Sequence, residues 1–570
     1  MKILGISCFY HDSAAVIIED GKIIAAAEEE RFSRIKHDSG FPTHAIEFCL
    51  EKSEISGSDL NWVVFYEKPF LKFERIILSS LATVPYAREM FVNGYRVWLK
   101  DKLWIKSTIS KNVGIDSSKI LFTQHHISHA GAAYYTSPFD SAAILTCDGV
   151  GEWTTTSWGK GKDNKVTLEK EIRFPHSLGL FYSAFTQFLG FQINEGEFKV
   201  MGLAPYGKPR FTQEVEKLIK QSSDGAFHLD LSYFNFHISD KVSFSQKFID
   251  LFGIKPLDPK RSDEVIPVYA DIAASAQKVL DEKLLVIARN IREKTGEENL
   301  CYAGGVALNG VTNWKIFKEA GFKNIFVHPA AGDSGGALGA ALYTYYHVFN
   351  KPKKNLFTTP YLGKENSEEE MKEFIEKNGI KTKKYSDKEL VEKVSDMLYR
   401  KKVIGWVRGR FEWGPRALGA RSILADPRDK KMKDLVNAKI KFREAFRPFA
   451  PVCLYEDGDK YFEVGKDGQN QQPLQYMIAV VPVRPQWQSK LGAITHVDGT
   501  ARPQFIKREV NPMYYDVVKA FGKKAGINVL LNTSFNLKGQ PIVNTCEEAY
   551  DTFMRSGIDA LVLGNYLIVK

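Results

Sequence analysis

The chain of 570 residues lacks several features that would assign it to a common class at once. It has only six cysteines, and none forms a C-x-x-C pair, which argues against a zinc ribbon or a redox dithiol. No apolar run approaches the ~18 residues of a membrane helix, and polar residues from Tyr10 to Asp12 interrupt any signal-peptide core. With 44% hydrophobic and 12% aromatic residues, disorder as the main state is excluded. We expect a folded cytoplasmic protein with reduced, buried cysteines and no membrane partner.

Positive charge is concentrated in one segment. Between Arg400 and Arg447 there are fifteen Lys or Arg and five Asp or Glu, and the difference of +10 equals the net charge of the whole chain. A local excess favours one cationic site for a small polyanion over a nucleic-acid-binding face. A solvated basic helix explains the charge alone equally well. We expect no nucleic-acid partner.

The order of apolar runs and turns predicts an α/β protein whose first domain is duplicated. Residues 3–7, 14–18 and 23–27 form a predicted three-stranded meander. Residues 142–146, 154–158 and 166–170 repeat this pattern, with 159–161 as the second turn, and both copies carry an Asp in the first turn. A repeated meander indicates two related halves that face a cleft.

A second α/β domain follows a linker rich in Lys, Thr and Pro. We place the first domain at residues 1–350, the linker at 351–366 and the second domain at 367–570. Two capping boxes begin at Ser367 and Ser386. Further strands are expected at 403–407, 477–481 and 529–531, with a final hairpin that turns at 564–565.

Two glycine-rich turns follow short apolar runs in the first domain. Residues 304–309 follow the run at 300–302, and residues 328–336 follow the run at 325–327. A strand, a glycine-rich turn and a helix allow phosphate or adenosine to approach the backbone, so both turns are candidate nucleotide sites. Each motif alone is not specific.

Histidines cluster at positions 125, 126 and 129. On a helix, His125 and His129 share one face, and the Glu of the zinc-protease motif H-E-x-x-H is missing between them. Asp148, in the turn after a buried strand, is the expected third ligand, and Asp333 is a fourth. Two His with carboxylates suit a divalent transition metal, Fe(II) among the candidates. The alternative is a pair of hydrogen-bonded core histidines.

Two other groups carry candidate chemistry. His11 and Asp12 lie in the first turn of the meander, where His11 is a candidate general base and the alternative is ordinary turn chemistry. In the second domain, Arg forks match phosphate oxygens, and we interpret three basic and polar stretches as converging on one polyanion, with ordinary basic loops as the alternative. The stretch 408–447 contains Arg416, Lys441, Arg443 and Arg447, the stretch 496–504 contains Arg502, and the stretch 532–536 contains Asn532, Ser534 and Asn536.

Together, these motifs resemble the O-carbamoyltransferases of the NodU/CmcH type, essentially from end to end. The resemblance rests on ordered motifs at residues 11–15, 28–32, 125–129, 147–149, 199–204, 304–309, 332–333, 414–419, 442–444 and 532–536. It implies a duplicated actin-like ATPase domain, similar to threonylcarbamoyl transferases, followed by a smaller YrdC-like domain. It also implies ATP with Mg²⁺ and carbamoyl phosphate as substrates, with carbamoyl adenylate as the intermediate.

The resemblance also implies roles for the candidate residues. His11, with Asp12, would activate the hydroxyl of a small-molecule or glycan acceptor, while His125, His129, Asp148 and Asp333 would hold the metal, Fe²⁺ in the preferred assignment. Carbamoyl phosphate and ATP would contact Arg416, Lys441, Arg443, Arg447, Arg502, Asn532, Ser534 and Asn536. The nucleotide or carbamoyl adenylate in the first domain would contact Lys199, Gly304, Gly305, Asn309, Gly332 and Gly335. The oligomeric state is left open by the residues, with a homodimer among the candidates.

Two rival functions are compatible with parts of this pattern. A tRNA threonylcarbamoyl-type transferase would share the first domain, but it needs a nucleic-acid footprint. An actin-like regulator that switches with ATP would not require the histidine cluster or the second domain. The residues do not identify the acceptor, although residues 68–106 and 227–252 are candidates for shaping its cleft.

Overall fold

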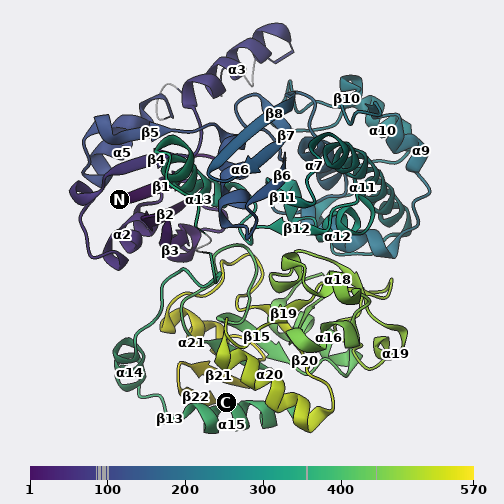
Figure 1. The fold of residues 1–570 in the computed structure, drawn as a ribbon. Coiled ribbons are helices and arrows are strands. Elements are labelled where there is room, and N and C mark those ends of the chain that lie inside the picture. The colour runs from purple at the N-terminus through teal and green to yellow at the C-terminus, as the bar shows by residue number, and fades with distance from the viewer. Residues whose placement is uncertain (85, 88–91, 93–97, 99–101, 355–356, 445) are drawn as a thin grey trace. The chain divides into compact units, whose positions relative to one another are not determined.

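In a computed structural model, the chain forms two compact units (Figure 1). The structure describes residues 1–84, 86–87, 92, 98, 102–354, 357–444 and 446–570. Unit 1 comprises Met1–Glu29 and Asp38–Phe357, and unit 2 comprises Glu30–His37 and Thr358–Lys570. Residues 30–37 therefore belong to the second unit. The expected division, with its linker at 351–366, placed them in the first domain.

Unit 1 contains two five-stranded sheets of one topology. Their strand orders are β3-β2-β1-β4-β5 and β8-β7-β6-β11-β12. In each sheet, an antiparallel meander is extended on its first strand by two parallel strands. This is the duplicated arrangement that the repeated meander predicted. The strands are β1 Lys2–Ser7, β2 Ala14–Glu19, β3 Lys22–Glu28, β4 Trp62–Phe65, β5 Ile120–Phe122, β6 Ser141–Cys147, β7 Thr154–Lys162, β8 Lys165–Arg173, β11 Asn299–Ala303 and β12 Asn324–Val327.

The second meander differs from the prediction at its second turn. Residues 159–161 continue strand β7, and the chain turns at 163–164 instead. Both glycines are needed for close packing: a Cβ on Gly161 would lie 2.4 Å from the ring of Tyr134, and one on Gly159 would lie 1.9 Å from the Thr167 carbonyl oxygen. Glycine here reflects a close approach across the sheet rather than a turn.

Two helices pack closely between the sheets of unit 1, α6 (His125–Thr136) and α13 (Asp333–Tyr343). A Cβ on Gly339 would lie 1.7 Å from the carbonyl oxygen of Ser128, so only glycine permits this contact. Helix α11 (Pro267–Thr295) is capped by Gly296 in the left-handed conformation. Other helices of unit 1 are α2 Thr43–Lys52, α3 Pro69–Ala82, α5 Ile105–Val113, α7 Leu178–Phe188, α8 Glu197–Leu203, α9 Thr212–Glu216, α10 Gln246–Phe252 and α12 Gly310–Glu319.

Unit 2 is built on an eight-stranded mixed sheet of order β13-β22-β21-β14-β15-β20-β16-β19. Both predicted capping boxes are present, at the starts of α14 (Glu368–Lys377) and α15 (Asp387–Tyr399). The sheet strands are β13 Lys383–Lys384, β14 Ile404–Val407, β15 Arg421–Ala425, β16 Ala450–Leu454, β19 Gln504–Ile506, β20 Val529–Ser534, β21 Ala560–Leu563 and β22 Tyr566–Val569. The helices include α16 Lys430–Val436, α18 Gly465–Gln469, α19 Pro485–Gln488, α20 Pro512–Ala525 and α21 Cys546–Met554.

The strand expected at residues 477–481 is wrong. Only Val481 is extended, in the two-residue strand β17 (Val481–Pro482). Met477 has a φ of 57°, and the N–H of Ile478 donates to the carbonyl of Pro473 at 2.9 Å, so the chain turns there. The apolar run reflects burial of the turn: Met477, Ile478 and Ala479 are each at most 3% exposed.

The segment 30–37 lies in unit 2 as a short helix, α1 (Glu30–Ser33), and a following turn. Arg31 is 1% exposed and donates to the carbonyl of Gly414 at 3.0 Å. Arg34 donates to the carbonyls of Pro541 and Ile542 at 3.0 and 2.7 Å. The six cysteines are free and buried, as predicted. Within the described ranges, no helix is both long and apolar enough to cross a membrane.

Candidate active sites

Four predicted metal ligands meet inside unit 1. His125 and His129 lie in the first turns of α6, Asp148 follows β6, and Asp333 is the first residue of α13. The two Nε2 atoms are 3.0 Å apart, and Asp148 Oδ2 lies 3.0 Å from that of His125. Asp333 Oδ1 lies 3.6 and 3.5 Å from the same two nitrogens. One ligand atom from each side chain thus lies within 4.8 Å of the others.

Burial and charge make this cluster suitable for a cation. All four side chains are buried, and among the described residues Asp333 Oδ2 has no hydrogen-bond partner. Burial opposes ionisation of Asp148, but hydrogen bonds from both histidines hold its pKa well below the usual value. Burial likewise opposes protonation of His129, yet hydrogen bonds to the two carboxylates raise its pKa to about 9. Two imidazole nitrogens and two carboxylates fit a divalent transition metal.

The third histidine of the motif has another role. His126 Nδ1 is 2.7 Å from Thr146 Oγ1, under the adjoining sheet. Burial, followed by repulsion from His125 and His129, holds the pKa of His126 well below 6.5. His126 is therefore a neutral core residue, which matches its omission from the predicted ligand set.

His11 and Asp12 lie in a turn held in an unusual conformation. Asp12 has a φ of 58°, and its Oδ2 is 3.3 Å from His11 Nδ1. The turn is held by hydrogen bonds from the N–H groups of Phe9 and Ser13 to the carbonyls of Ser39 and Asp38. Burial opposes the charge on His11, but Asp12, Asp333 and Asp148 together raise its pKa to about 9. The acidic cluster thus acts electrostatically on His11.

Some of the predicted nucleotide-binding residues are engaged in hydrogen bonds within the protein. Gly304 has a φ of 94°, and the N–H of Gly305 donates to Asp148 Oδ1 at 2.8 Å, so this turn orients a predicted metal ligand. Asn309 caps α12 and donates to Gln277 Oε1 at 3.0 Å, which engages its side chain within the protein.

The other three predicted nucleotide residues lie on two elements. Lys199 lies on α8, with its ammonium 5.5 Å from the centre of the Phe191 ring. Gly332 precedes α13 and Gly335 lies in its first turn, where a Cβ would lie 1.9 Å from the carbonyl of Ala330. The first turn of α13 therefore combines small residues with the predicted ligand Asp333.

Sequence reasoning missed two buried carboxylates beside the metal cluster. Glu152 Oε1 accepts the backbone N–H of His125 at 3.0 Å and that of Lys68 at 2.8 Å. Glu67 Oε2 accepts from Lys72 Nζ at 2.5 Å and lies 3.9 Å from His125 Nδ1. Glu152 was detectable as an acid four residues after Asp148, whereas nothing near Glu67 in the sequence marks it.

Unit 2 brings the predicted arginines together. Burial and then the charge of Arg447 lower the pKa of Arg416 to about 10. For Arg502, burial and the charges of Arg416, Arg443 and Arg447 hold the pKa well below 12.5. Among the described residues, the ion pair recorded for these arginines joins Arg447 to Glu444 at 3.3 Å. Cations that repel one another in a desolvated site favour a bound anion.

Lys441, Ser534 and Asn536 form a connected group beside the arginines. Lys441 Nζ donates to the carbonyl and Oγ of Ser534 at 2.8 and 3.1 Å, and to the carbonyl and Oδ1 of Asn536 at 3.0 and 2.6 Å. Burial, followed by Arg443 and Arg447, holds the pKa of this lysine well below 10.5. The side chains named from the sequence thus contact each other although they lie 93 and 95 positions apart along the chain.

Asn532 supports the loop that carries Arg416. Its Nδ2 donates to the carbonyl of Ala417 and to Gln504 Oε1, both at 3.1 Å. Glu412, fully buried, accepts the N–H groups of Leu418, Ala420 and Arg421 at 2.8, 2.6 and 3.1 Å. The conformation of the loop is therefore fixed by polar contacts on both sides.

Family models match both parts of the chain. The model described as carbamoyltransferase N-terminus matches residues 2–342, and the one described as carbamoyltransferase C-terminus matches residues 395–570. The chain belongs to the carbamoyltransferase family. It is a carbamoyltransferase-family enzyme, as the sequence motifs predicted.

Similar proteins extend over nearly the whole carbamoyltransferase chain. An uncharacterized protein of Synechocystis, sll1178, is 43% identical over all of this chain and 96% of its own length. Nodulation protein NolNO of Sinorhizobium fredii is 37% identical over 99% of this chain and 79% of its own. Nodulation protein U of Sinorhizobium fredii is 28% identical over 95% and 94%. The crystal structure of T. kodakarensis HypF aligns at 15% identity over 63% of this chain and 49% of its own, with a TM-score of 0.30.

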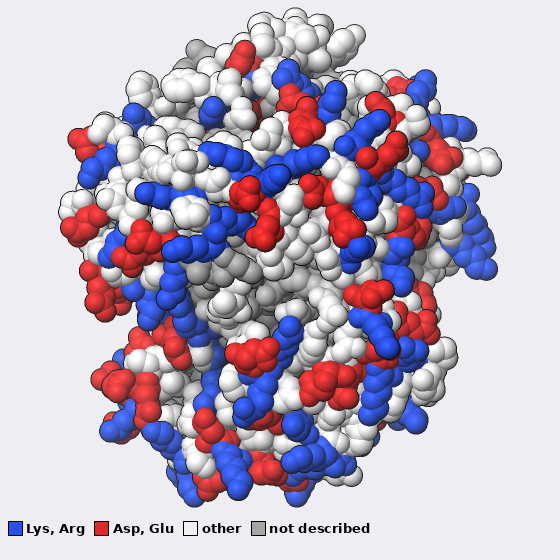
Figure 2. Space-filling model, viewed as in Figure 1, with Lys and Arg blue, Asp and Glu red and all other residues white. Residues whose placement is uncertain are grey.

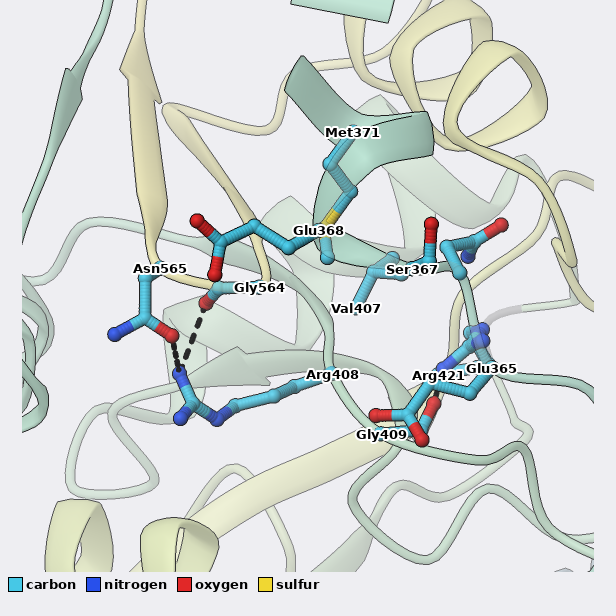
Figure 3. A pocket seen from close by; sticks show the side chains of 11 residues that line it. Glu365, Ser367, Glu368, Met371, Val407, Arg408, Gly409, Arg421, Gly564 and Asn565 are labelled. Carbon is cyan, nitrogen blue, oxygen red and sulfur yellow. Dashed lines mark hydrogen bonds between the residues drawn. The ribbon is translucent and has the colours of Figure 1, made fainter. Parts of the chain in front are cut away.

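A polar cavity of about 330 Å³ lies elsewhere in unit 2 of the carbamoyltransferase, at the ends of the parallel strands β14 and β21 (Figure 3). Arg408 borders it but donates to the carbonyl of Gly564 and to Asn565 Oδ1 at 3.0 and 2.7 Å. Arg421 donates to the carbonyl oxygens of Gly409, Ala420 and Lys364. None of the predicted site residues lines this cavity, and the arginines there are engaged by protein oxygens.

Proposed function

We propose that the protein is an ATP-dependent O-carbamoyltransferase with two reaction sites. Unit 2, as a YrdC-like domain, forms carbamoyl adenylate from carbamoyl phosphate and ATP with Mg²⁺. Unit 1 transfers the carbamoyl group to a hydroxyl of a small-molecule or glycan acceptor. The observation that carries this proposal is the group of neighbouring buried arginines in unit 2, whose pKa values are lowered by burial and then by one another's charge.

The first reaction joins two anionic substrates. Water first cleaves carbamoyl phosphate to carbamate and inorganic phosphate. A carbamate oxygen then attacks the α-phosphate of ATP and pyrophosphate leaves, so negative charge accumulates around one phosphorus atom. Arg416, Arg443 and Arg502 supply preorganised positive charge for this step, and no solvent rearrangement is needed when the charge develops. Lys441 holds the turn with Ser534 and Asn536 beside them.

The second reaction needs a base and an electrophile. In our assignment, His11 accepts the proton of the acceptor hydroxyl, and Asp12 orients its ring through the 3.3 Å contact at Nδ1. His125, His129, Asp148 and Asp333 hold a divalent metal, with Fe²⁺ preferred, which when bound supplies Lewis-acid polarisation. A cation there would also offset the carboxylate charges that raise the pKa of His11, and so favour its neutral, basic form.

The decisive experiment needs no acceptor. Purified protein is supplied with ATP and Mg²⁺, with and without carbamoyl phosphate, and pyrophosphate release is measured. We expect release that depends on carbamoyl phosphate. If metal-replete, folded protein releases none under either condition, even with candidate alcohols present, the adenylation role of unit 2 is wrong and a nucleotide-binding regulator becomes the better assignment.

The acceptor class is the remaining part of the proposal. The relatives NolNO and NodU are named for nodulation, but that name is theirs and identifies no acceptor here. Of the stretch 68–106 that we expect to shape the cleft, residues 85, 88–91, 93–97 and 99–101 lie outside the described residues. Residues 227–252 pack through a group of phenylalanines that includes Phe234, Phe244 and Phe248, which points to a core role for that stretch.

A nucleic-acid acceptor is the rival to test. On the face drawn in Figure 2, Lys and Arg side chains are interspersed with Asp and Glu, rather than gathered into a basic track. This supports a small acceptor, because nucleic-acid binding depends on several phosphate contacts. We expect no shift of tRNA in an electrophoretic mobility assay at low salt. A tRNA complex that weakens steeply with added salt would instead support the threonylcarbamoyl-type assignment.

A further inference from the structure

The inner ring nitrogen of His125 is left without a hydrogen bond. Its Nε2 faces the carboxylates of the metal cluster, whereas its Nδ1 is buried and makes no hydrogen bond to the residues that the structure describes. Binding a cation through Nε2 requires the neutral ring to carry its proton on Nδ1. A metal-bound His125 would therefore present a buried N–H donor that needs an acceptor.

Glu67 lies beside that nitrogen. It follows strand β4 by two positions, its side chain is 4% exposed, and its Oε2 is 3.9 Å from His125 Nδ1. The same oxygen is 2.5 Å from Lys72 Nζ, on α3, and the lysine is also buried. The lysine ammonium further lies 5.3 Å from the centre of the Tyr10 ring. Lys72 Nζ and His125 Nδ1 thus face the same buried oxygen of Glu67.

We propose that Glu67 is a positioning residue for the metal site. In the loaded protein, His125 Nδ1–H donates to Glu67 after a shift of about 1 Å from the present separation, which is longer than a hydrogen bond. The contact selects the tautomer of His125, fixes the ring plane and makes Nε2 a stronger donor to the metal. Lys72 balances the charge of Glu67. This inference rests on the proposed metal role of the cluster.

The two histidine ligands differ in this respect. His129 Nδ1 is also buried and has no hydrogen-bond partner, but within the part of the chain that the structure describes, the recorded carboxylate contacts of His129 are at Nε2 alone. Glu67 therefore acts through one ligand only. Its removal should weaken the metal site without abolishing it, in contrast to loss of a ligand.

The test is a titration of the metal-free, full-length protein with Co²⁺, followed by visible absorption and equilibrium dialysis. We expect Glu67→Gln to weaken Co²⁺ binding by about 10- to 100-fold and to change the d–d spectrum of the bound ion. Glu67→Asp should restore part of the affinity. Glu74→Gln is the matched control, because Glu74 is an exposed glutamate on α3, two positions after Lys72. This variant should bind Co²⁺ as the wild type does.

A second variant separates a metal role from loss of the ion pair. Lys72→Met leaves Glu67 in place and removes a nearby positive charge, so we expect Co²⁺ binding that is unchanged or tighter. If Lys72→Met weakens binding as much as Glu67→Gln does, or if Glu67→Gln binds within twofold of the wild type while His125→Ala does not bind, the inference is wrong. If the wild type itself binds no metal, the failure lies in the proposed metal site. Should Glu67→Gln not fold, Glu67→Asp and Lys72→Met decide the question.

Discussion

The two candidate sites bury charge in opposite ways. In unit 1, two histidines and two aspartates face each other within 4.8 Å, and each sign supports the other. In unit 2, Arg416, Arg443 and Arg502 are neighbours of like charge, and burial and mutual repulsion both lower their pKa values. In the first cluster the carboxylates pair with imidazole nitrogens, whereas the recorded ion pair of the second group is that of Arg447 with Glu444, and we propose that a bound anion completes its charge balance.

This difference indicates what each site binds. A balanced His and Asp cluster exchanges protons for a metal cation and keeps its net charge near constant. A cluster of arginines lowers its free energy by binding polyanions, and gains most where several phosphates meet. The metal site and the polyanion site should therefore fail independently, and each of the following variants tests that independence.

The largest expected effect is that of His125→Ala. The variant removes one of four ligands, so we expect no measurable binding of stoichiometric Co²⁺ and a loss of carbamoyl transfer on the order of 10³-fold. Pyrophosphate release dependent on carbamoyl phosphate should stay near the wild-type rate, because the arginines of unit 2 are unchanged. His126→Ala, which removes a neutral histidine of the same helix turn, is the comparison. If His125→Ala lost pyrophosphate release as strongly as carbamoyl transfer, the two sites would be coupled and their independence would be contradicted.

Arg416→Ala should produce the reverse pattern. Removing one preorganised cation from the polyanion site should lower pyrophosphate release by about 10²- to 10³-fold. Co²⁺ binding by unit 1 should be unchanged. Arg508→Ala is the matched control, since that arginine is exposed and pairs with Asp516 on the surface of unit 2. A normal rate of pyrophosphate release from Arg416→Ala would remove this arginine from the site.

His11→Ala sharpens the comparison within unit 1. If His11 is the base, the variant should bind metal and release pyrophosphate as the wild type does, while carbamoyl transfer to an acceptor falls by about 10²-fold. The two half-reactions are measured as pyrophosphate and as carbamoylated product. Survival of both would withdraw the catalytic role of His11 and leave the turn interpretation of His11 and Asp12.

Much of this arrangement was predictable because it is encoded locally. The repeated meander predicted the first three strands of each sheet of unit 1, since apolar runs and turn residues are short-range signals. The spacing of His125 and His129 predicted their shared helix face. Asp148 was predictable from its place after a buried strand.

Long-range packing escaped prediction. Nothing local indicates that residues 30–37 contact unit 2, where Arg31 bonds to Gly414, 383 positions away. Glu67 approaches His125 only because β4 ends beside α6, and its sequence neighbours carry no metal-binding pattern. Gly159 and Gly161 were assigned to a turn because glycine is common in turns. Glycine also permits close contact across a sheet, and a sequence does not distinguish the two uses. The apolar run at 477–481 was assigned to a strand because, in a sequence, a buried turn and a buried strand give the same apolar pattern.

A last variant concerns a buried carboxylate of unit 1 that belongs to neither cluster. Asp281 is 6% exposed and accepts from Thr312 Oγ1 at 2.6 Å and Gln277 Nε2 at 2.8 Å, both at Oδ1. Burial, only partly opposed by these hydrogen bonds, raises its pKa from 3.8 to about 6. Because the folded pKa exceeds the unfolded one, Asp281 favours folding fully below pH 4, and this contribution is lost as the pH rises to about 6.

Asp281→Asn keeps the Oδ1 acceptor and removes the titration. We expect the variant to be more stable than the wild type at pH 7 by at most about 3 kcal/mol, and the two to converge below pH 4. Thermal unfolding of both proteins between pH 4 and pH 8 measures the difference. Asp551→Asn, on the exposed face of α21 in unit 2, should not show this pH dependence. A difference that stays constant with pH would mean that Asp281 is ionised in the folded protein, so that a buried charge in unit 1 needs neither a facing histidine nor a metal.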